Sequence, residues 1–166
     1  MKKMVMAAML AALGVLTSHL IYVPVGIAKC FPMQHGVNVI AGVLFGPWYA
    51  VGTALTISMI RNLSGTGTIL AFPGSMIGAY FAGLFYLKTG KIEAAALGEL
   101  MGTGIFGALL AVPMANLFLG TSKAAFALVI PFAVSSLGGA MIASIVLKST
   151  VLQQMIETNR SGQRTY

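Results

Sequence analysis

Glu99 has the clearest chemical potential in this chain, because it is a carboxylate inside a long apolar stretch. It stands in the segment Leu-Gly-Glu-Leu-Met-Gly-Thr-Gly, which ends at Gly104. An ionisable group inside a membrane span costs about 2.5–3.5 kcal/mol on insertion scales, so its presence suggests a function. Thr103 lies four residues later and shares the helix face of Glu99. We interpret both as hydrogen-bonding groups in a binding cavity. The alternative is a structural pairing of Glu99 with Arg61 or with a backbone donor.

A second group of polar residues, Gln34, His35 and Asn38, opens another apolar stretch. Residues 34 and 38 share one face of a helix, with residue 35 beside them. All three side chains carry donors and acceptors, which suits recognition of a polar heterocycle. The alternative is an interfacial helix start, where polar residues act as caps. His35 and Cys30 are too few ligands for a recognised metal site, so we expect no metal and no cofactor.

A third group follows the next apolar stretch. Arg61-Asn62 leads into the loop Gly65-Thr-Gly-Thr68, and Phe72 lies just beyond it. The loop is not a phosphate-binding P-loop, because no Gly-Lys-Ser/Thr follows it. We expect Arg61, Asn62 and Thr66 to hold this loop over a ligand and Phe72 to stack on an aromatic ring. The alternatives are an Arg61 that reaches to the membrane edge and a Phe72 that anchors the interface.

The composition places these groups in a membrane. Of 166 residues, 58% are hydrophobic and only 8% are charged, whereas soluble domains carry about 25% charged residues. The three acidic residues are all Glu, so metal sites on paired aspartates and Asp–His–Ser triads are excluded. One cysteine cannot form an internal disulfide. The net charge of +7 indicates cytoplasmic loops that face anionic lipid rather than binding to nucleic acid.

Hydropathy predicts an all-α integral membrane protein with six transmembrane helices. We expect one membrane domain over residues 1–157, a polar cytoplasmic tail over 158–166, and no ATPase domain. The basic start and apolar run resemble a signal peptide, but no small-residue cleavage site follows, so we interpret the run as the first span. The predicted spans cover about residues 4–23, 34–46, 47–61, 73–88, 91–119 and 122–148.

The positions of Lys and Arg predict that both chain ends face the cytoplasm. With six spans, seven basic residues fall on the inner side and three on the outer side. The polar connections Pro24–Met33 and Asn62–Pro73 then both lie outside, and we expect the small-molecule opening there. The inner residues are Lys2, Lys3, Lys88, Lys91, Lys148, Arg160 and Arg164, and the outer ones are Lys29, Arg61 and Lys123.

The first span also carries two overlapping pairs of small residues, Ala7 with Ala11 and Ala8 with Ala12. Such pairs form a flat strip on which another helix packs. The pattern alone does not say whether that helix belongs to this chain or to a partner.

Several runs of this sequence resemble the ThiW family. They are Lys29-Cys-Phe-Pro-Met-Gln-His35, Asn38-Val-Ile-Ala-Gly-Val-Leu-Phe-Gly-Pro-Trp-Tyr49, the stretch from Arg61 to Gly78, and Leu97-Gly-Glu-Leu-Met-Gly-Thr-Gly104. The likeness covers roughly residues 5–120, whereas the sixth span and the tail are generic.

The resemblance implies a substrate-binding S component of an energy-coupling-factor (ECF) vitamin transporter in the plasma membrane of a prokaryote. Such a subunit has six helices with both ends inside, and this family is thought to bind hydroxyethylthiazole, a small neutral heterocycle. Its partners are a transmembrane T component and two ATPase subunits. The alanine pairs in the first helix would dock on the T component, and substrate would lie near the outer face.

Two other classes remain open at this stage. The first is a stand-alone secondary transporter, which would use Glu99 as its proton site. Within the favoured class, thiamin or its pyrimidine precursor would be alternative ligands of an S component. An intramembrane enzyme is disfavoured, because no serine stands in a nucleophile motif and there is no Asp. We expect no enzymatic activity in this chain, and ATP hydrolysis in the partner subunits.

Overall fold

The structure of the protein is a computed structural model that describes residues 2–25, 28–120, 125–149, 152–154 and 156–157. The predicted tail, residues 158–166, lies outside the described residues. The start of the predicted sixth span, residues 122–124, lies outside them as well.

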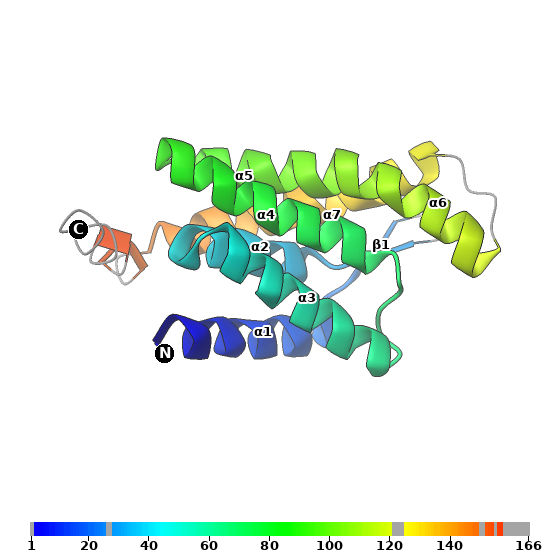
Figure 1. The fold of residues 1–166 in the computed structure, drawn as a ribbon, viewed down its shortest axis with the longest axis horizontal. Helices are drawn as coiled ribbons and strands as arrows, with labels where there is room; N and C mark the ends of the chain where they lie inside the picture. The colour runs from blue at the N-terminus through cyan, green and yellow to red at the C-terminus, as the bar shows by residue number, and fades with distance from the viewer. Residues whose placement is uncertain (1, 26–27, 121–124, 150–151, 155, 158–166) are drawn as a thin grey trace.

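Helices dominate the described residues, and each predicted apolar stretch contains one (Figure 1). Three consecutive elements, α5, η1 and α6, run on as one rod, so the named helices form six rods. Two of these, Ile92–Phe118 and Ala127–Leu147, are long and apolar enough to cross a membrane. The helices are α1 (Lys2–Leu20), α2 (Pro32–Phe45), α3 (Pro47–Leu63), α4 (Ala71–Thr89), α5 (Ile92–Met101), the π-helical η1 (Gly102–Gly107), α6 (Ala108–Leu119) and α7 (Ala125–Leu147).

The rods run lengthwise between two ends of the molecule. The start of α1 and the end of α7 lie at one end, whereas the loop between α3 and α4 lies at the other (Figure 1). An antiparallel hairpin, β1 (Val23–Val25) with β2 (Ala28–Cys30), lies at that second end as well. The two polar connections of the sequence are therefore neighbours at one end of the bundle.

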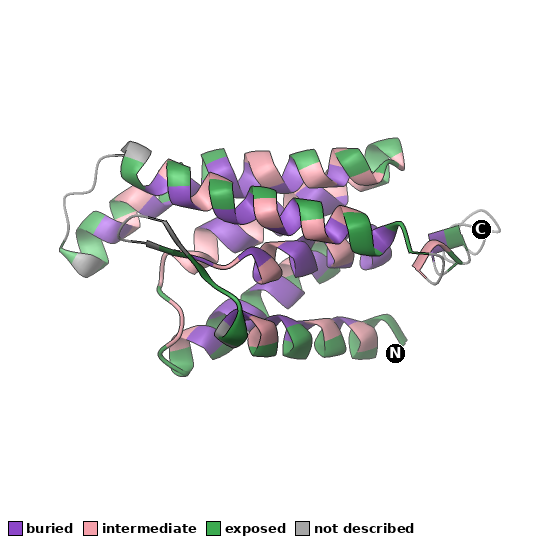
Figure 2. Ribbon diagram, turned by 180° about the vertical axis from the view of Figure 1, so that it is seen from behind, coloured by how far each residue is buried: buried purple, intermediate pink, exposed green. Residues whose placement is uncertain are grey.

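Helix α2 forms the centre of the bundle and carries much of the candidate site. It packs against α1, α3, α4 and α7, and 11 of its 14 residues are buried (Figure 2). Pro32 occupies its first turn, where a fixed φ favours helix and the missing N–H is no loss. Because α2 is enclosed by protein, its Gln34 and Asn38 are core residues and not the caps of an interfacial helix.

The rod α5–η1–α6 packs closely on α4 through glycine. Gly102 faces Gly78, where an added Cβ would lie 2.7 Å from the Gly78 Cα, and Gly107 faces Gly74. The two α4 residues are four apart in sequence, but their partners are five apart. The π-helical turn accommodates that extra residue, since its bonds span five residues instead of four. The turn therefore keeps Thr103 and Glu99 facing inward while the glycine contacts continue.

Several helix boundaries differ by two or three residues from the predicted spans; α3, for example, continues to Leu63, and α4 begins at Ala71. The first helix ends at Leu20, three residues before the predicted end of the span, and the hairpin follows. Hydropathy could not show that residues 21–23 lie beyond the helix and that Val23 begins a strand, because short apolar runs fit either structure. The second helix begins at Pro32, two residues before the predicted start.

Candidate ligand-binding site

Polar side chains from four neighbouring rods meet inside the bundle and form what we call the polar cluster. Seven members are at most 2% exposed, and the side chain of His35 is 12% exposed. The cluster comprises Gln34, His35 and Asn38 of α2, Ser58 and Arg61 of α3, Ser75 of α4, Glu99 of α5 and Thr103 of η1.

Glu99 is the centre of one half of the cluster. Its Oε1 lies 2.7 Å from His35 Nδ1, and it accepts a hydrogen bond from Asn38 Nδ2 at 3.2 Å. Thr103 Oγ1 is 2.9 Å from the same oxygen and equally close to the carbonyl of Gly74, so its single proton serves one of the two. Glu99 is thus held by His35 and not by the alternative partner Arg61.

Gln34 connects the two halves of the cluster. Its Nε2 donates to Ser58 Oγ at 3.0 Å and to Ser75 Oγ at 2.8 Å, while its Oε1 accepts a hydrogen bond from Arg61 Nη1. Ser75 also accepts from Asn38 Nδ2 at 3.2 Å. Hydrogen bonds therefore run without a break from Arg61 to Glu99.

Arg61 belongs to the interior and not to the membrane edge. It is 2% exposed, so the interpretation as a residue that reaches to the surface is wrong. Its Nη2 donates to the carbonyl of Thr66 at 3.1 Å, and its Cζ lies 3.8 Å from the centre of the Phe31 ring. One guanidinium group thereby contacts the α3–α4 loop, α2 and the residue that follows the hairpin.

Of the remaining residues predicted for the site, Asn62 and Thr66 lie beside the polar cluster. Thr66 contributes its carbonyl to Arg61, and its hydroxyl donates back to the Arg61 carbonyl at 3.3 Å. Asn62 Nδ2 donates to the carbonyls of Ser58 and Thr68, which fastens the loop to the end of α3. Phe72, in the first turn of α4, is half-buried and is not a member of the cluster.

Two cluster members, Ser58 and Ser75, were not singled out by the sequence analysis. Ser58 precedes Arg61 by three residues, so helical spacing places both on one face of α3. That signal was present in the sequence. Ser75 had no comparable neighbour, because its partners come from α2.

Three buried polar atoms of the described side chains lack a hydrogen-bond partner, and all three belong to the polar cluster. They are Asn38 Oδ1, Glu99 Oε2 and Arg61 Nε. A buried polar group without a partner costs about 1–3 kcal/mol, so such groups need an explanation. Their concentration in one cluster fits a site in which a bound molecule supplies the missing partners.

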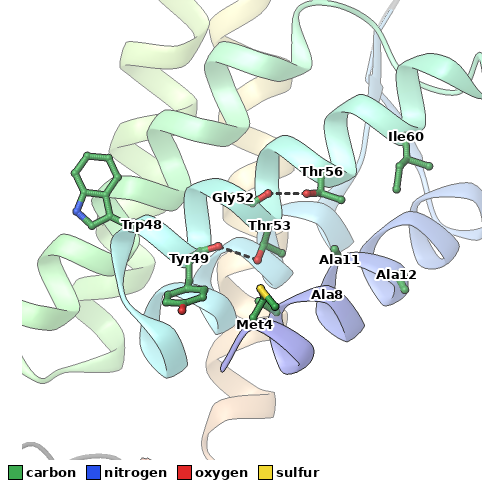
Figure 3. Close-up of a pocket in the computed structure, with 11 residues that line it drawn as sticks. Met4, Ala8, Ala11, Ala12, Trp48, Tyr49, Gly52, Thr53, Thr56 and Ile60 are labelled. Atoms are coloured by element: carbon green, nitrogen blue, oxygen red, sulfur yellow. Dashed lines mark hydrogen bonds between the residues drawn. The ribbon is translucent and has the colours of Figure 1, made fainter. Parts of the chain in front are cut away.

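A second feature is a groove on the outside of the bundle, between α1 and α3, with a volume of about 480 Å³ (Figure 3). All four alanines of the two pairs line it, but Ala8 and Ala12 are exposed, whereas Ala7 and Ala11 are only 8% and 3% exposed. The two overlapping alanine pairs therefore differ in their exposure. One pair packs mainly within this chain, and the other faces outward. The opposite wall of the groove is formed by α3 residues, namely Trp48, Tyr49, Gly52, Thr53, Thr56 and Ile60.

These features define an all-α protein with a cluster of buried polar side chains inside its helical bundle. The family model described as thiamine-precursor transporter protein (ThiW) matches residues 4–154, and the chain belongs to this family. Its general function is therefore the transport of a thiamine precursor. No curated protein and no solved structure matches the chain.

Gly78 is expected to be intolerant of a side chain, because an added Cβ would lie 2.7 Å from both carboxylate oxygens of Glu99 and closer still to Thr103 Oγ1. We expect Gly78→Ala to destabilise the protein by about 1–3 kcal/mol, as overpacked cores do. Gly52→Ala is the control, since nothing lies within 4 Å of its added Cβ. Thermal denaturation in detergent compares them, and equal melting temperatures would contradict the predicted clash.

Cys30 is expected to react slowly while the hairpin stays in place. Its thiol is 2% exposed and donates to the carbonyl of Pro131 in α7 at 3.1 Å, and burial raises its pKa. Because the thiolate is the reactive form, alkylation at pH 8 should be much slower than for a free thiol and should accelerate in denaturant. Mass spectrometry of maleimide labelling measures the rate. Labelling of the folded protein at the rate of free cysteine would refute the buried position.

Proposed function

We propose that this chain is the membrane-embedded substrate-binding subunit of an ECF-type importer and that it binds hydroxyethylthiazole from the extracellular side. The observation that carries the proposal is the polar cluster with its three unpartnered buried atoms. Membership of a thiamine-precursor transporter family supports the choice of ligand class.

The ligand fits the chemistry of the polar cluster. Hydroxyethylthiazole is small and neutral, with one hydroxyl group and one ring nitrogen. Its hydroxyl can donate to Glu99 Oε2 or Asn38 Oδ1, which are acceptors without a donor. The members of the cluster bind one another, so an entering ligand must break some of these hydrogen bonds. The Arg61–Gln34 bond is a candidate, because Arg61 also contacts the α3–α4 loop.

The proposed arrangement in the membrane has six spans with both chain ends in the cytoplasm of a prokaryotic cell. The hairpin and the α3–α4 loop would then face outward, above the polar cluster. Entry would require displacement of the loop carbonyl that Arg61 holds.

The energy for transport is proposed to come from partners, namely a transmembrane T component and two ATPase subunits. The exposed pair Ala8 and Ala12 would dock on the T component through the groove between α1 and α3. Small residues suit this role, because they let two helices approach closely.

Isothermal titration of the purified full chain with hydroxyethylthiazole tests the ligand. We expect saturable binding with one site per chain and a rise in melting temperature. Absence of heat and of a thermal shift at high micromolar ligand would refute the proposal.

The pairing of Glu99 with His35 favours one second candidate, a proton-coupled transporter that works alone. Uptake by vesicles that contain only this chain separates the two candidates. The ECF proposal expects no uptake under an imposed proton gradient and ATP-dependent uptake once the T component and ATPases are added. Gradient-driven uptake by the chain alone would establish the second candidate instead.

A further inference from the structure

Arg61 carries a hydrogen-bond donor in the polar cluster that has no acceptor. Three neighbouring donors of the predicted site are already engaged: His35 Nδ1 lies against Glu99, Asn62 Nδ2 donates to two main-chain carbonyls, and Thr103 Oγ1 donates to Glu99 or Gly74. Arg61 Nε is buried and has no partner. Among the described side chains it is the one buried donor atom in this state.

The guanidinium group of Arg61 is also held in a fixed orientation. Nη1 donates to Gln34 and Nη2 donates to the Thr66 carbonyl, while the plane lies over the Phe31 ring with Cζ 3.8 Å from its centre. All of these contacts are to neutral groups. An arginine fixed in this way presents its Nε–H in one direction and adds an uncompensated positive charge to its surroundings.

The acceptors without donors, Glu99 Oε2 and Asn38 Oδ1, lie in the other half of the cluster. Asn38 turns its amide nitrogen to acceptors, 3.1 Å from the Ser75 carbonyl and 3.2 Å from Glu99 Oε1, which leaves Oδ1 as the atom without a partner. A complementary ligand therefore donates a hydrogen at one end and accepts one at the other.

From this pattern we infer that Arg61 Nε donates its hydrogen bond to the free lone pair of a ring nitrogen, so that the site selects an uncharged azole or azine alcohol and rejects N-alkylated azolium alcohols that carry no further N–H donor, such as the N-methyl thiazolium alcohol. The inference rests on the proposed function, because it assumes that the polar cluster is where the precursor binds. Arg61 is then a specificity-determining residue of the transporter.

An N-alkylated ring fails in either orientation. With its hydroxyl toward Glu99, the ring nitrogen has no lone pair for Arg61 Nε, and its positive charge faces the guanidinium. In the reverse orientation the hydroxyl can satisfy Arg61, but Glu99 Oε2 and Asn38 Oδ1 receive no N–H or O–H donor. Sites that leave a buried polar group unpaired reject the unsuitable ligand strongly.

Titration of the wild-type full chain with three matched alcohols tests the inference without any variant. The ligands are hydroxyethylthiazole, its N-methyl thiazolium salt and the thiophene alcohol in which CH replaces the ring nitrogen. We expect each of the last two to bind at least about tenfold more weakly than the first, because each leaves either the buried Arg61 donor or the acceptors of Glu99 and Asn38 unpaired. Equal affinity of the thiophene alcohol or of the thiazolium salt would overturn the inference.

Two variants then test whether Arg61 is the source of the preference for the thiazole alcohol. In Arg61→Gln, the preference for thiazole over thiophene should fall to less than about threefold, since the lost contact is the source of the preference. Lys29→Gln is the matched control: it removes a positive charge from the same end of the bundle, but Lys29 is exposed and contacts the Tyr22 ring. It should keep the full preference. A full preference in Arg61→Gln, or its loss in Lys29→Gln, would overturn the assignment. If the wild-type chain binds none of the three alcohols, the proposed function itself fails.

Discussion

Replacement of Glu99 by Gln should weaken hydroxyethylthiazole binding by about 10- to 100-fold, because a hydrogen bond to a charged group contributes roughly 1.5–3 kcal/mol. The substitution keeps the volume of the side chain. One amide oxygen can still accept from Asn38 and Thr103, but the amide NH₂ replaces Oε2, the atom that lacks a donor. An acceptor that faces the ligand hydroxyl thereby becomes a donor. Titration calorimetry of both purified proteins measures the difference.

A comparison with Glu99→Ala separates binding from folding. Alanine removes both oxygens, so His35 Nδ1 loses its partner inside the bundle and Asn38 Nδ2 keeps only its contacts to Ser75. We expect that variant to melt well below Glu99→Gln, whereas both lose affinity. If Glu99→Gln binds hydroxyethylthiazole as tightly as the wild type, Glu99 is not a ligand contact.

Replacement of Ala8 and Ala12 by Trp should abolish assembly with the T component while ligand binding persists. Both residues are exposed and line the groove between α1 and α3, so the bulky side chains would fill the space that a partner helix needs. They do not touch the polar cluster, which lies inside the bundle. Co-purification of tagged chain with the T component and ATPases measures assembly, and calorimetry measures binding.

The matched control for this pair is Met9→Trp. Met9 is 68% exposed on the same helix, but it does not line the groove. This variant should assemble normally. Larger residues at Ala7 and Ala11 should instead lower the melting temperature, because those alanines pack within the chain. Normal assembly of the Ala8 and Ala12 double variant would exclude the groove as the docking surface.

The sequence predicted helices well, because long apolar runs between polar turns are a strong signal. It failed where a short segment carries two interpretations. The first span was predicted to run to Val23, whereas the helix ends at Leu20 and Val23 begins a strand, since a few apolar residues after a helix look the same in either state. The π-helical turn was not predicted either. The sequence hints at this turn only through glycine spacing: Gly102 and Gly107 are five residues apart, whereas their partners Gly78 and Gly74 are four apart. That mismatch can be recognised only once the two helices are known to pack together.

The candidate site was predictable in its members but not in its connections. Helical spacing and the cost of polar groups in a membrane singled out Gln34, Asn38 and Glu99, and these do meet. Whether Arg61 points inward or toward the membrane edge depends on the path of the α3–α4 loop, whose carbonyl holds the guanidinium. Pairing between distant helices, such as His35 with Glu99, likewise depends on tertiary packing that a single sequence does not encode in its local pattern.

An experimental structure of the full chain with bound hydroxyethylthiazole tests the central claim most directly. We predict the ligand inside the bundle, enclosed by α2, α3, α4 and α5, with its hydroxyl on Glu99 Oε2 or Asn38 Oδ1. Ligand bound in the groove between α1 and α3, or anywhere that leaves the bonds of the polar cluster unchanged, would contradict the account.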